Sequence, residues 1–134
     1  MRYLLDTNIC IYVAKGRPAP VMSHFARLKQ GDAGISVVTY LELVYGAWKS
    51  ARFEENFARI ATFERLVPAQ PLDGTVARHY AKLRTDLERA GSQIGPYDML
   101  IAAHALSLGA TLVTNNVREF SRVPGLRLEN WAKG

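Results

Sequence analysis

Short apolar runs alternate along the chain with longer stretches in which apolar residues recur every three or four positions. The runs predict five short strands, at Tyr3–Leu5, at a very short segment closed by Ile35, and at Leu66–Ala69, Thr111–Thr114 and Leu126–Leu128. The longer stretches predict helices at Ile9–Lys15, Ala19–Gln30, from Ser36 or Thr39 to Ser50, Arg52–Arg65, from Asp73 to Ala90, Tyr97–Leu108 and, as a short turn, Val117–Phe120. Strand and helix therefore alternate through the whole sequence.

The predicted helix before Ser50 carries the most regular apolar stripe. Val37, Leu41, Val44 and Trp48 recur at helical spacing, so we expect this face to pack against the core.

Strands separated by helices are typical of a parallel sheet, because two parallel strands need a crossover between them. A length of 134 residues corresponds to one domain. The sequence therefore predicts a single α/β domain over residues 1–134, with helices on both faces of the sheet.

The composition is that of a folded chain, with 49% hydrophobic and 22% charged residues. The one cysteine, Cys10, excludes an internal disulfide and a cysteine-based zinc site and fits a reducing compartment. No apolar run approaches the ~20 residues that span a bilayer. Asp6 also interrupts the first apolar run too early for a signal peptide. We expect a cytoplasmic protein without membrane contact.

The charge favours a polyanionic partner. Seventeen basic and twelve acidic residues give a net charge of +5. If Asp6, Glu42 and Asp98 gather at one site, the rest of the surface has seventeen basic against nine acidic side chains, a net charge of +8. A basic body around a small acidic spot indicates a polyanion, such as a nucleic acid, that is bound over a wide surface and acted on locally.

These acids are expected to meet at one edge of the sheet. Asp6 directly follows the first strand, Glu42 lies within two turns of the start of its helix, and Asp98 lies in the first turn of its own. Asn116 comes just after the fourth strand. In parallel sheets, such positions face the carboxyl edge, where ligands bind.

Carboxylates that gather beside apolar helices need a cation, because unpaired charges there are costly and repel one another. Mg²⁺ and Mn²⁺ prefer oxygen ligands and keep several waters. Each acid also has an ordinary structural alternative. Asp6 is a possible helix cap, Asp98 suits the helix dipole, and Glu42 is a possible surface residue.

The sequence resembles the PIN-domain ribonucleases, specifically the VapC toxins of bacterial type II toxin–antitoxin systems. The resemblance covers the whole chain. The segments that carry it are Leu4-Leu5-Asp6-Thr7-Asn8, Ser36-Val37-Val38-Thr39-Tyr40-Leu41-Glu42-Leu43-Val44-Tyr45-Gly46, Ile94-Gly95-Pro96-Tyr97-Asp98-Met99-Leu100-Ile101-Ala102 and Leu112-Val113-Thr114-Asn115-Asn116.

The resemblance implies strand order 3-2-1-4-5 and an acidic pocket for Mg²⁺, with Mn²⁺ able to replace it. Asp6 and Asp98 are similar to the family's direct metal ligands, and Glu42 to its third acid. Asn116 stands where many PIN domains have a fourth acid, and Glu119 is near enough in sequence to replace it. Nearby polar residues expected to support the pocket are Thr114, Thr7 and Asn8.

The chemistry expected of this site is hydrolysis of RNA. Water attack on a phosphodiester, with Glu42 or Asp98 taking the proton, leaves a 5′-phosphate and a 3′-hydroxyl. Basic side chains are expected to follow the RNA backbone without selecting bases. They are Lys15, Arg17, Arg78, Lys82 and Arg118, with Arg89 and Arg122.

The resemblance is strongest to enterobacterial-type VapC toxins, which implies cleavage of initiator tRNA in its anticodon stem-loop and inhibition of translation. It also implies a VapB antitoxin, a toxin homodimer, and a larger complex that binds DNA through the antitoxin. The apolar face of Phe53, Phe57 and Ile60 is a candidate antitoxin contact, with core packing as the alternative.

Three alternatives remain. A phosphoacceptor receiver domain needs an aspartate after the third strand, where this chain has Pro68-Ala69-Gln70. A non-catalytic nucleic-acid-binding module would have little use for the acids, which repel phosphate. Metal-free RNA cleavage by a histidine pair such as His79 and His104 requires a proximity that no pattern here indicates.

Overall fold

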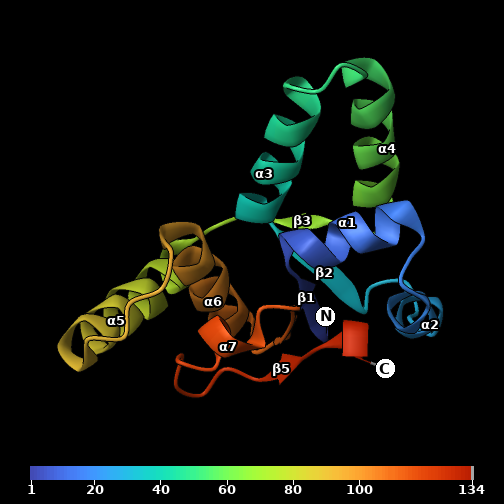
Figure 1. Ribbon diagram of the computed structural model, residues 1–134. Helices are drawn as coiled ribbons and strands as arrows, with labels where there is room; N and C mark the ends of the chain where they lie inside the picture. Colours follow the sequence, from blue (N-terminus) through green and yellow to red (C-terminus); the bar gives the residue numbers. More distant parts are fainter. Residues whose placement is uncertain (134) are drawn as a thin grey trace.

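A five-stranded parallel sheet forms the centre of the computed structural model, which describes residues 1–133 (Figure 1). Its order, β3-β2-β1-β4-β5, agrees with the order implied by the family resemblance. The strands are short: β1 (Tyr3–Leu5), β2 (Ala33–Ser36), β3 (Ala69–Gln70), β4 (Thr111–Val113) and β5 (Leu128–Glu129).

The register of the central strands decides which residues meet at the carboxyl edge. In the pairing of β1 with β4, Leu5 lies opposite Val113. The next residue on β1, Asp6, donates its backbone N–H to the Val113 carbonyl at 3.0 Å. The residues that follow β1 and β4, Asp6 and Thr114, are therefore neighbours although 108 positions separate them.

The helices occupy the crossovers between the strands. They are α1 (Thr7–Lys15), α2 (Ala19–Ala26), α3 (Val37–Trp48), α4 (Phe53–Leu66), α5 (Gly74–Ala90), α6 (Pro96–Leu108) and α7 (Val117–Phe120), followed by a 3₁₀ turn, η1 (Trp131–Lys133). Within residues 1–133, none of these helices combines the length and hydropathy needed to cross a membrane.

Alternation along the strands supplies a separate apolar core to each face of the sheet. Leu4 and Leu112 point to one face, where α5, α6 and α7 cover them. Leu5 and Val113 point to the other face and pack with residues of α1, α2 and η1, including Trp131. All four strand residues are fully buried. Helices therefore cover both faces of the sheet, as the sequence predicts.

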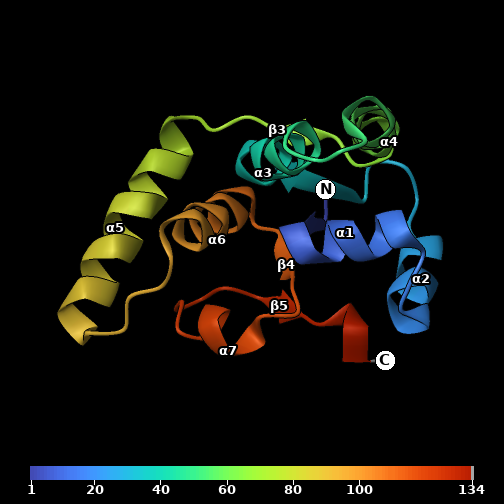
Figure 2. The ribbon, with the colours of Figure 1, turned by 45° about the horizontal axis from the view of Figure 1, so that its top comes forward.

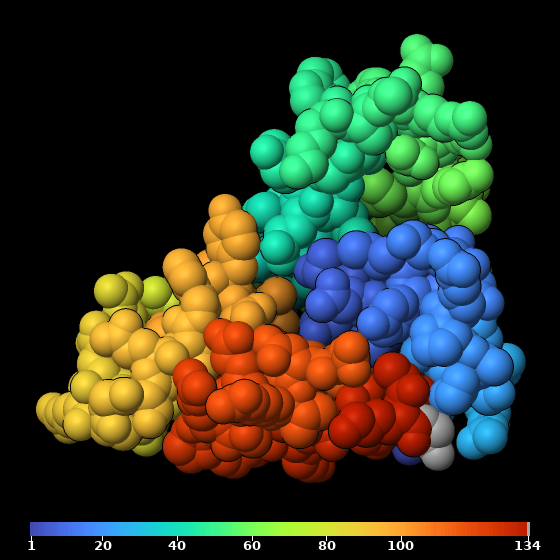
Figure 3. Space-filling view, viewed as in Figure 1, coloured from blue at the N-terminus to red at the C-terminus, as the bar shows by residue number. Residues whose placement is uncertain are grey.

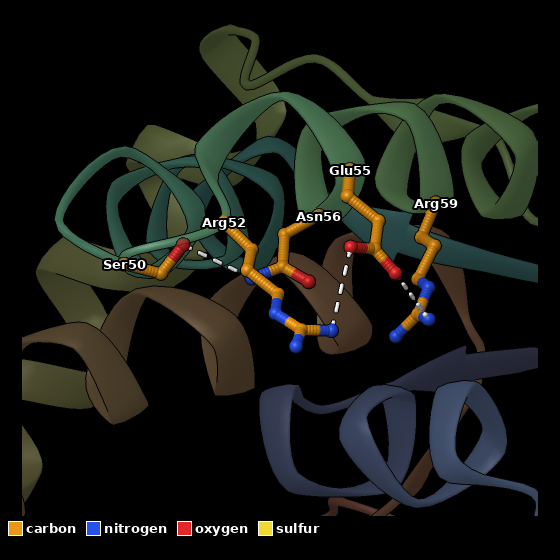
Figure 4. A network of polar contacts seen from close by, with 5 residues as sticks. All are labelled: Ser50, Arg52, Glu55, Asn56 and Arg59. Atoms are coloured by element: carbon orange, nitrogen blue, oxygen red, sulfur yellow. Dashed lines mark hydrogen bonds and ion pairs between the residues drawn. The ribbon is translucent and has the colours of Figure 1, made fainter.

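An arm made of α3 and α4 stands off the body of the protein (Figures 1 and 3). Its turn is held by polar contacts, shown in Figure 4: Asn56 donates to Ser50 Oγ at 3.0 Å, and Glu55 pairs with Arg59 at 2.9 Å and with Arg52 at 3.7 Å. These side chains lie on the side of α4 that faces α1 (Figure 4).

The predicted core stripe on α3 is wrong in part. Trp48 is 69% exposed and Leu41 46% exposed, whereas the buried residues of this helix are Val38, Thr39 and Ala47. Trp48 packs instead on Phe53 of α4, with ring centroids 4.6 Å apart. Because α3 contacts both the body and α4, it has more apolar residues than core positions, and spacing alone did not identify the buried face.

Several predicted boundaries also differ from the structure. Of the strand predicted at Leu66–Ala69, Leu66 ends α4 and only Ala69 belongs to β3, which is Ala69–Gln70. The second helix ends at Ala26 rather than Gln30, and the last strand is Leu128–Glu129. Ser36, not Thr39, caps α3 by accepting from the Val38 N–H.

Truncation of a buried strand residue tests this arrangement. We expect Leu112→Ala to lower the free energy of unfolding by about 3 kcal/mol, because it leaves a cavity in a rigid core between β4 and the helices. Urea denaturation followed by circular dichroism measures the change. Leu66→Ala is the control, since Leu66 is 61% exposed and its truncation should cost less than about 1 kcal/mol. Equal losses would contradict the assignment of Leu112 to the core.

Candidate active site

A polar cavity of about 180 Å³ opens at the carboxyl edge of the sheet. It contains the three acids predicted from the sequence, together with Asn116 and the supporting pair Thr7 and Asn8. The full lining is Asp6, Thr7, Asn8, Glu42, Asp98, Ile101, Asn116 and Phe120. The fold thus gathers residues from the end of β1, from α1, α3, α6 and α7, and from the segment after β4.

Asp6 is the most deeply placed of the acids, with 6% of its surface exposed. Its Oδ1 accepts the Ile9 N–H at 3.0 Å, which caps α1, and its Oδ2 accepts from the Thr114 hydroxyl. Burial raises the pKa of Asp6, and these hydrogen bonds partly oppose that effect. Asp6 therefore both caps a helix and presents a carboxylate to the cavity.

Thr114 has a structural role that the sequence did not specify. Besides donating to Asp6, its hydroxyl oxygen accepts the Asn116 N–H at 2.9 Å. The side chain is fully buried. Thr114 thus orients the Asp6 carboxylate and fixes the start of the loop that carries Asn116.

Glu42 projects from α3 toward the start of α1. The Thr7 hydroxyl donates to its Oε1 at 3.0 Å, which joins the two helices beside the cavity. Glu42 is half-buried, and its charge contributes to raising the pKa of Asp6 and of Asp98.

Asp98 lies in the first turn of α6, opposite the other acids. Burial is the main reason that its pKa is raised to about 6, followed by repulsion from Glu119, Asp6 and Glu42. The carboxylates around the cavity are therefore close enough to make ionisation of Asp98 less favourable.

Glu119 is more closely involved than sequence spacing indicated. Its Oε1 accepts the Gly95 N–H at 2.9 Å and its Oε2 accepts from Asn116 Nδ2 at 2.9 Å. These bonds lower the pKa of Glu119, while its charge and its hydrogen bond with Asp98 raise the pKa of Asp98. Both residues considered for the fourth position, Asn116 and Glu119, thus lie beside Asp98.

A signal for the involvement of Glu119 is present in the sequence. Gly95 is the N-cap of α6, so its own N–H has no acceptor within the helix. An acceptor from elsewhere is therefore required, and α7 supplies the Glu119 carboxylate.

The predicted RNA-binding residues are not brought together in one place. Lys15 and Arg17 line a shallow hollow between α1, α2 and α4, in which Arg59 also lies. Arg78 and Lys82 belong to α5, on the opposite side of the protein in both ribbon views (Figures 1 and 2), and Lys82 pairs with Asp86 at 2.8 Å. Arg118 lies exposed on α7. Their role in RNA binding stays a prediction.

The oxygen-rich lining fits a hard divalent cation. Carboxylate and amide oxygens are the ligands that Mg²⁺ and Mn²⁺ prefer, and Asp6, Glu42, Asp98 and Asn116 supply them. Within residues 1–133, no three Asp, Glu, His or Cys side chains already stand in an arrangement that holds a metal ion. Mg²⁺ tolerates this, because it commonly binds one or two carboxylates directly and the others through water.

Comparison with known proteins places the chain in a family. The PIN domain profile matches residues 3–126. A protein of Shigella flexneri named tRNA(fMet)-specific endonuclease VapC is 46% identical over 132 residues, which cover 98% of this chain and 99% of that protein.

Two solved structures have the same fold over their whole length. One is DNA-bound VapBC from Salmonella typhimurium, with a TM-score of 0.91, 41% identity and 98% of each chain covered. The other is VapBC2 from Rickettsia felis bound to a fragment of its promoter DNA, with a TM-score of 0.90, 39% identity, and 98% of this chain and 99% of that chain covered. The shared sheet, the site at its carboxyl edge and these full-length similarities show that the chain belongs to the PIN-domain family, among the VapC ribonucleases.

Proposed function

We propose that this protein is the toxin of a VapBC toxin–antitoxin pair and an endoribonuclease that depends on Mg²⁺ or Mn²⁺. The single observation that carries the proposal is the convergence of Asp6, Glu42 and Asp98 on one cavity at the carboxyl edge of the sheet. Full-length relatives named as ribonucleases and as a tRNA(fMet)-specific endonuclease support the reaction class.

The chain's own groups suit hydrolysis of a phosphodiester. Asp6 and Asp98 would hold the cation, with Asn116 or Glu119 beside them. A bound divalent cation would lower the pKa of a water molecule and stabilise charge on the departing oxygen. Glu42, oriented by Thr7, accepts the proton of the attacking water. Because water attacks, the products carry a 5′-phosphate and a 3′-hydroxyl, and the RNA 2′-hydroxyl takes no part.

The proposed substrate is tRNA, and more narrowly initiator tRNA cut in its anticodon stem-loop. The Shigella flexneri and Salmonella typhimurium relatives are both named for tRNA(fMet). The net charge of +5 favours a polyanion, and Lys15, Arg17 and Arg118 are available to contact its backbone. Such cleavage would remove initiator tRNA and stop translation in the cytoplasm.

The proposed regulator is a VapB-type antitoxin. Structures of VapBC complexes, two of them bound to DNA, share this fold. A cavity of about 330 Å³ between α1, α3 and α4 reaches from Thr7 and Glu42 to Lys15 and Arg59, and Ile60 and Phe63 form part of its apolar wall. An antitoxin segment there would lie against the acidic site. We further propose a toxin homodimer within a larger complex that binds DNA through the antitoxin.

Of the three residues expected to contact the antitoxin, Ile60 alone lines this cavity. Phe53 and Phe57 pack on one another at the arm, with centroids 5.6 Å apart, and neither belongs to the two apolar cores of the sheet, so the core-packing alternative does not hold for them.

Removal of one carboxylate tests the proposed chemistry. We expect purified protein with Mg²⁺ to cut total tRNA, and Asp6→Asn and Asp98→Asn to lower the rate by about 100-fold or more, because each loses charge that holds the cation. EDTA should abolish cutting. Gel electrophoresis measures the rate, and mass spectrometry identifies the ends.

The matched control is Glu54→Gln, which removes one exposed acid from α4 and should cut at the wild-type rate. A 2′,3′-cyclic phosphate at the new end would contradict water attack. Binding of RNA and Mn²⁺ without cleavage would favour a non-catalytic module, and cleavage that survives both Asp6→Asn and Asp98→Asn would remove these two acids from the mechanism.

The raised pKa of Asp98 predicts how stability depends on pH. In the folded protein this carboxyl keeps its proton up to about pH 6, whereas the unfolded chain releases it near the ordinary value of 3.8. Folding therefore takes up a proton between these values, so the contribution of Asp98 to stability is lost as pH rises from about 4 to about 6. In metal-free buffer, Asp98→Asn should melt a few degrees above the wild type at pH 8.

Addition of Mn²⁺ should reverse that order. The wild-type Tm should rise with Mn²⁺ at pH 8, and the Asp98→Asn Tm should hardly change, because the variant has lost a negative charge that holds the cation. Thermal melts at pH 4 and pH 8, with and without Mn²⁺, measure both effects. If Asp98→Asn without metal melts below the wild type at pH 8, the Asp98 charge is favourably paired, and the predicted effect of its raised pKa is wrong.

A further inference from the structure

A second group of buried polar side chains lies outside the cavity. The buried polar residues of the described chain are Asp6 and Thr114, which belong to the site, and Ser36, Thr39 and His104. His104 is 1% exposed on α6, and its Nδ1 lies 2.8 Å from Oγ of the fully buried Ser36. A buried polar pair is costly unless its hydrogen bonds are complete, so this pair needs a physical reason.

The hydrogen bonds determine the protonation state of the ring. Ser36 Oγ accepts the Val38 N–H at 3.1 Å and lies 2.8 Å from His104 Nδ1, and the ring tautomer decides which of these two atoms donates. The ring also bonds to the backbone carbonyl of Pro71, in the loop before α5, and this bond requires a proton on Nε2. We assign His104 as a neutral imidazole with its proton on Nε2, because in this tautomer Nδ1 accepts from Ser36 and Nε2 donates to the Pro71 carbonyl.

The surroundings keep the ring neutral. Burial lowers the pKa of His104, and the charge of Asp73, at the start of α5, opposes this only in part. A second proton on Nδ1 would point at Ser36 Oγ and leave the serine proton without that acceptor.

This pair connects the two helices that supply opposing acids. Ser36 caps α3 six positions before Glu42, and His104 follows Asp98 by six positions on α6. Six residues of helix correspond to about 9 Å of rise, so each acid lies within two turns of the junction. Of the hydrogen bonds found within residues 1–133, no other joins a side chain of α6 to α3 or to its cap.

We propose that His104 is a positioning residue that sets the separation of the Glu42 and Asp98 carboxylates by tying α6 to the cap of α3. The inference rests on the proposed function, because this separation matters only if both acids serve one cation. His104 itself touches neither acid and takes no part in the reaction.

Two substitutions of His104 distinguish a role through hydrogen bonds from one of filling space in the core. His104→Leu keeps an apolar side chain of moderate size but loses both hydrogen bonds. His104→Asn retains an amide oxygen near the place of Nδ1 that accepts from Ser36. The matched control is Ser107→Ala, which removes a 2.8 Å bond to the His104 carbonyl on the same helix and has no link to α3.

The test is titration of each metal-free protein with Mn²⁺ by calorimetry, without RNA, after circular dichroism has verified folding. We expect His104→Leu to weaken Mn²⁺ binding about tenfold, the lower end of what outer partners of a metal site cost. His104→Asn should recover most of the loss, and Ser107→Ala should bind as the wild type. Equal affinities for the wild type and His104→Leu, or equal losses in the Leu and Asn variants, would overturn the proposal.

A second measurement needs no metal and also covers the case in which His104→Leu fails to fold. Nitrogen-15 NMR of the wild-type imidazole at pH 7 should show a neutral ring with its proton on Nε2. A doubly protonated ring, or a proton on Nδ1, would contradict the assigned network. A wild-type protein that binds no Mn²⁺ would overturn the proposed function and this inference together, whereas binding that is indifferent to His104 would overturn this inference alone.

Discussion

Repulsion among carboxylates in a partly buried cavity is the constraint on which this structure depends. Asp6, Glu42 and Asp98 do not attract one another, because each negative charge makes ionisation of its neighbours less favourable. The fold must supply the opposing free energy. It does so with the two apolar cores of the sheet and with hydrogen bonds that hold individual acids, such as Thr114 on Asp6 and Thr7 on Glu42.

The parallel sheet makes this concentration of charge possible. The cores lie on the two faces of the strands, whereas the site lies at their carboxyl ends, so packing and chemistry use different surfaces of the same elements. Leu5 is fully buried in a core, and the next residue, Asp6, lines the cavity. Substitutions in the cavity can therefore remove the reaction without removing the core, which is why the isosteric Asn variants are informative.

The separation of the cores from the carboxyl edge also explains which site residues could be predicted from the sequence. Asp6, Asp98 and Asn116 were predictable because each lies just after a strand or at the start of a helix. At such positions the topology of a parallel sheet alone places a residue at the carboxyl edge. Glu119 was harder to assign, because its place depends on the unsatisfied N–H of Gly95, a contact across 24 positions. Leu41 and Trp48 were wrongly predicted to be buried, because helical spacing identifies an apolar face but not what packs against it. The helix α3 packs against both the body of the protein and α4. The predicted boundaries of β3 and β5 were wrong because two residues are too few to show the alternation of apolar and polar positions that identifies a strand.

The electrostatics of the cavity make proton and cation competitors for one position. With its pKa raised to about 6, Asp98 is mostly ionised at neutral pH, yet in the folded protein its ionised form has repelling neighbours. Protonation below about pH 6 relieves that repulsion, and binding of the proposed divalent ion would relieve it above that pH. Cation binding near pH 6 must then release a proton, so its apparent affinity falls as the pH is lowered. Under the proposed function, such a site holds a proton at low pH and a cation when it is active. The contact between His104 and Ser36, which carries no charge in the tautomer assigned above, would then keep the acids in place through that exchange.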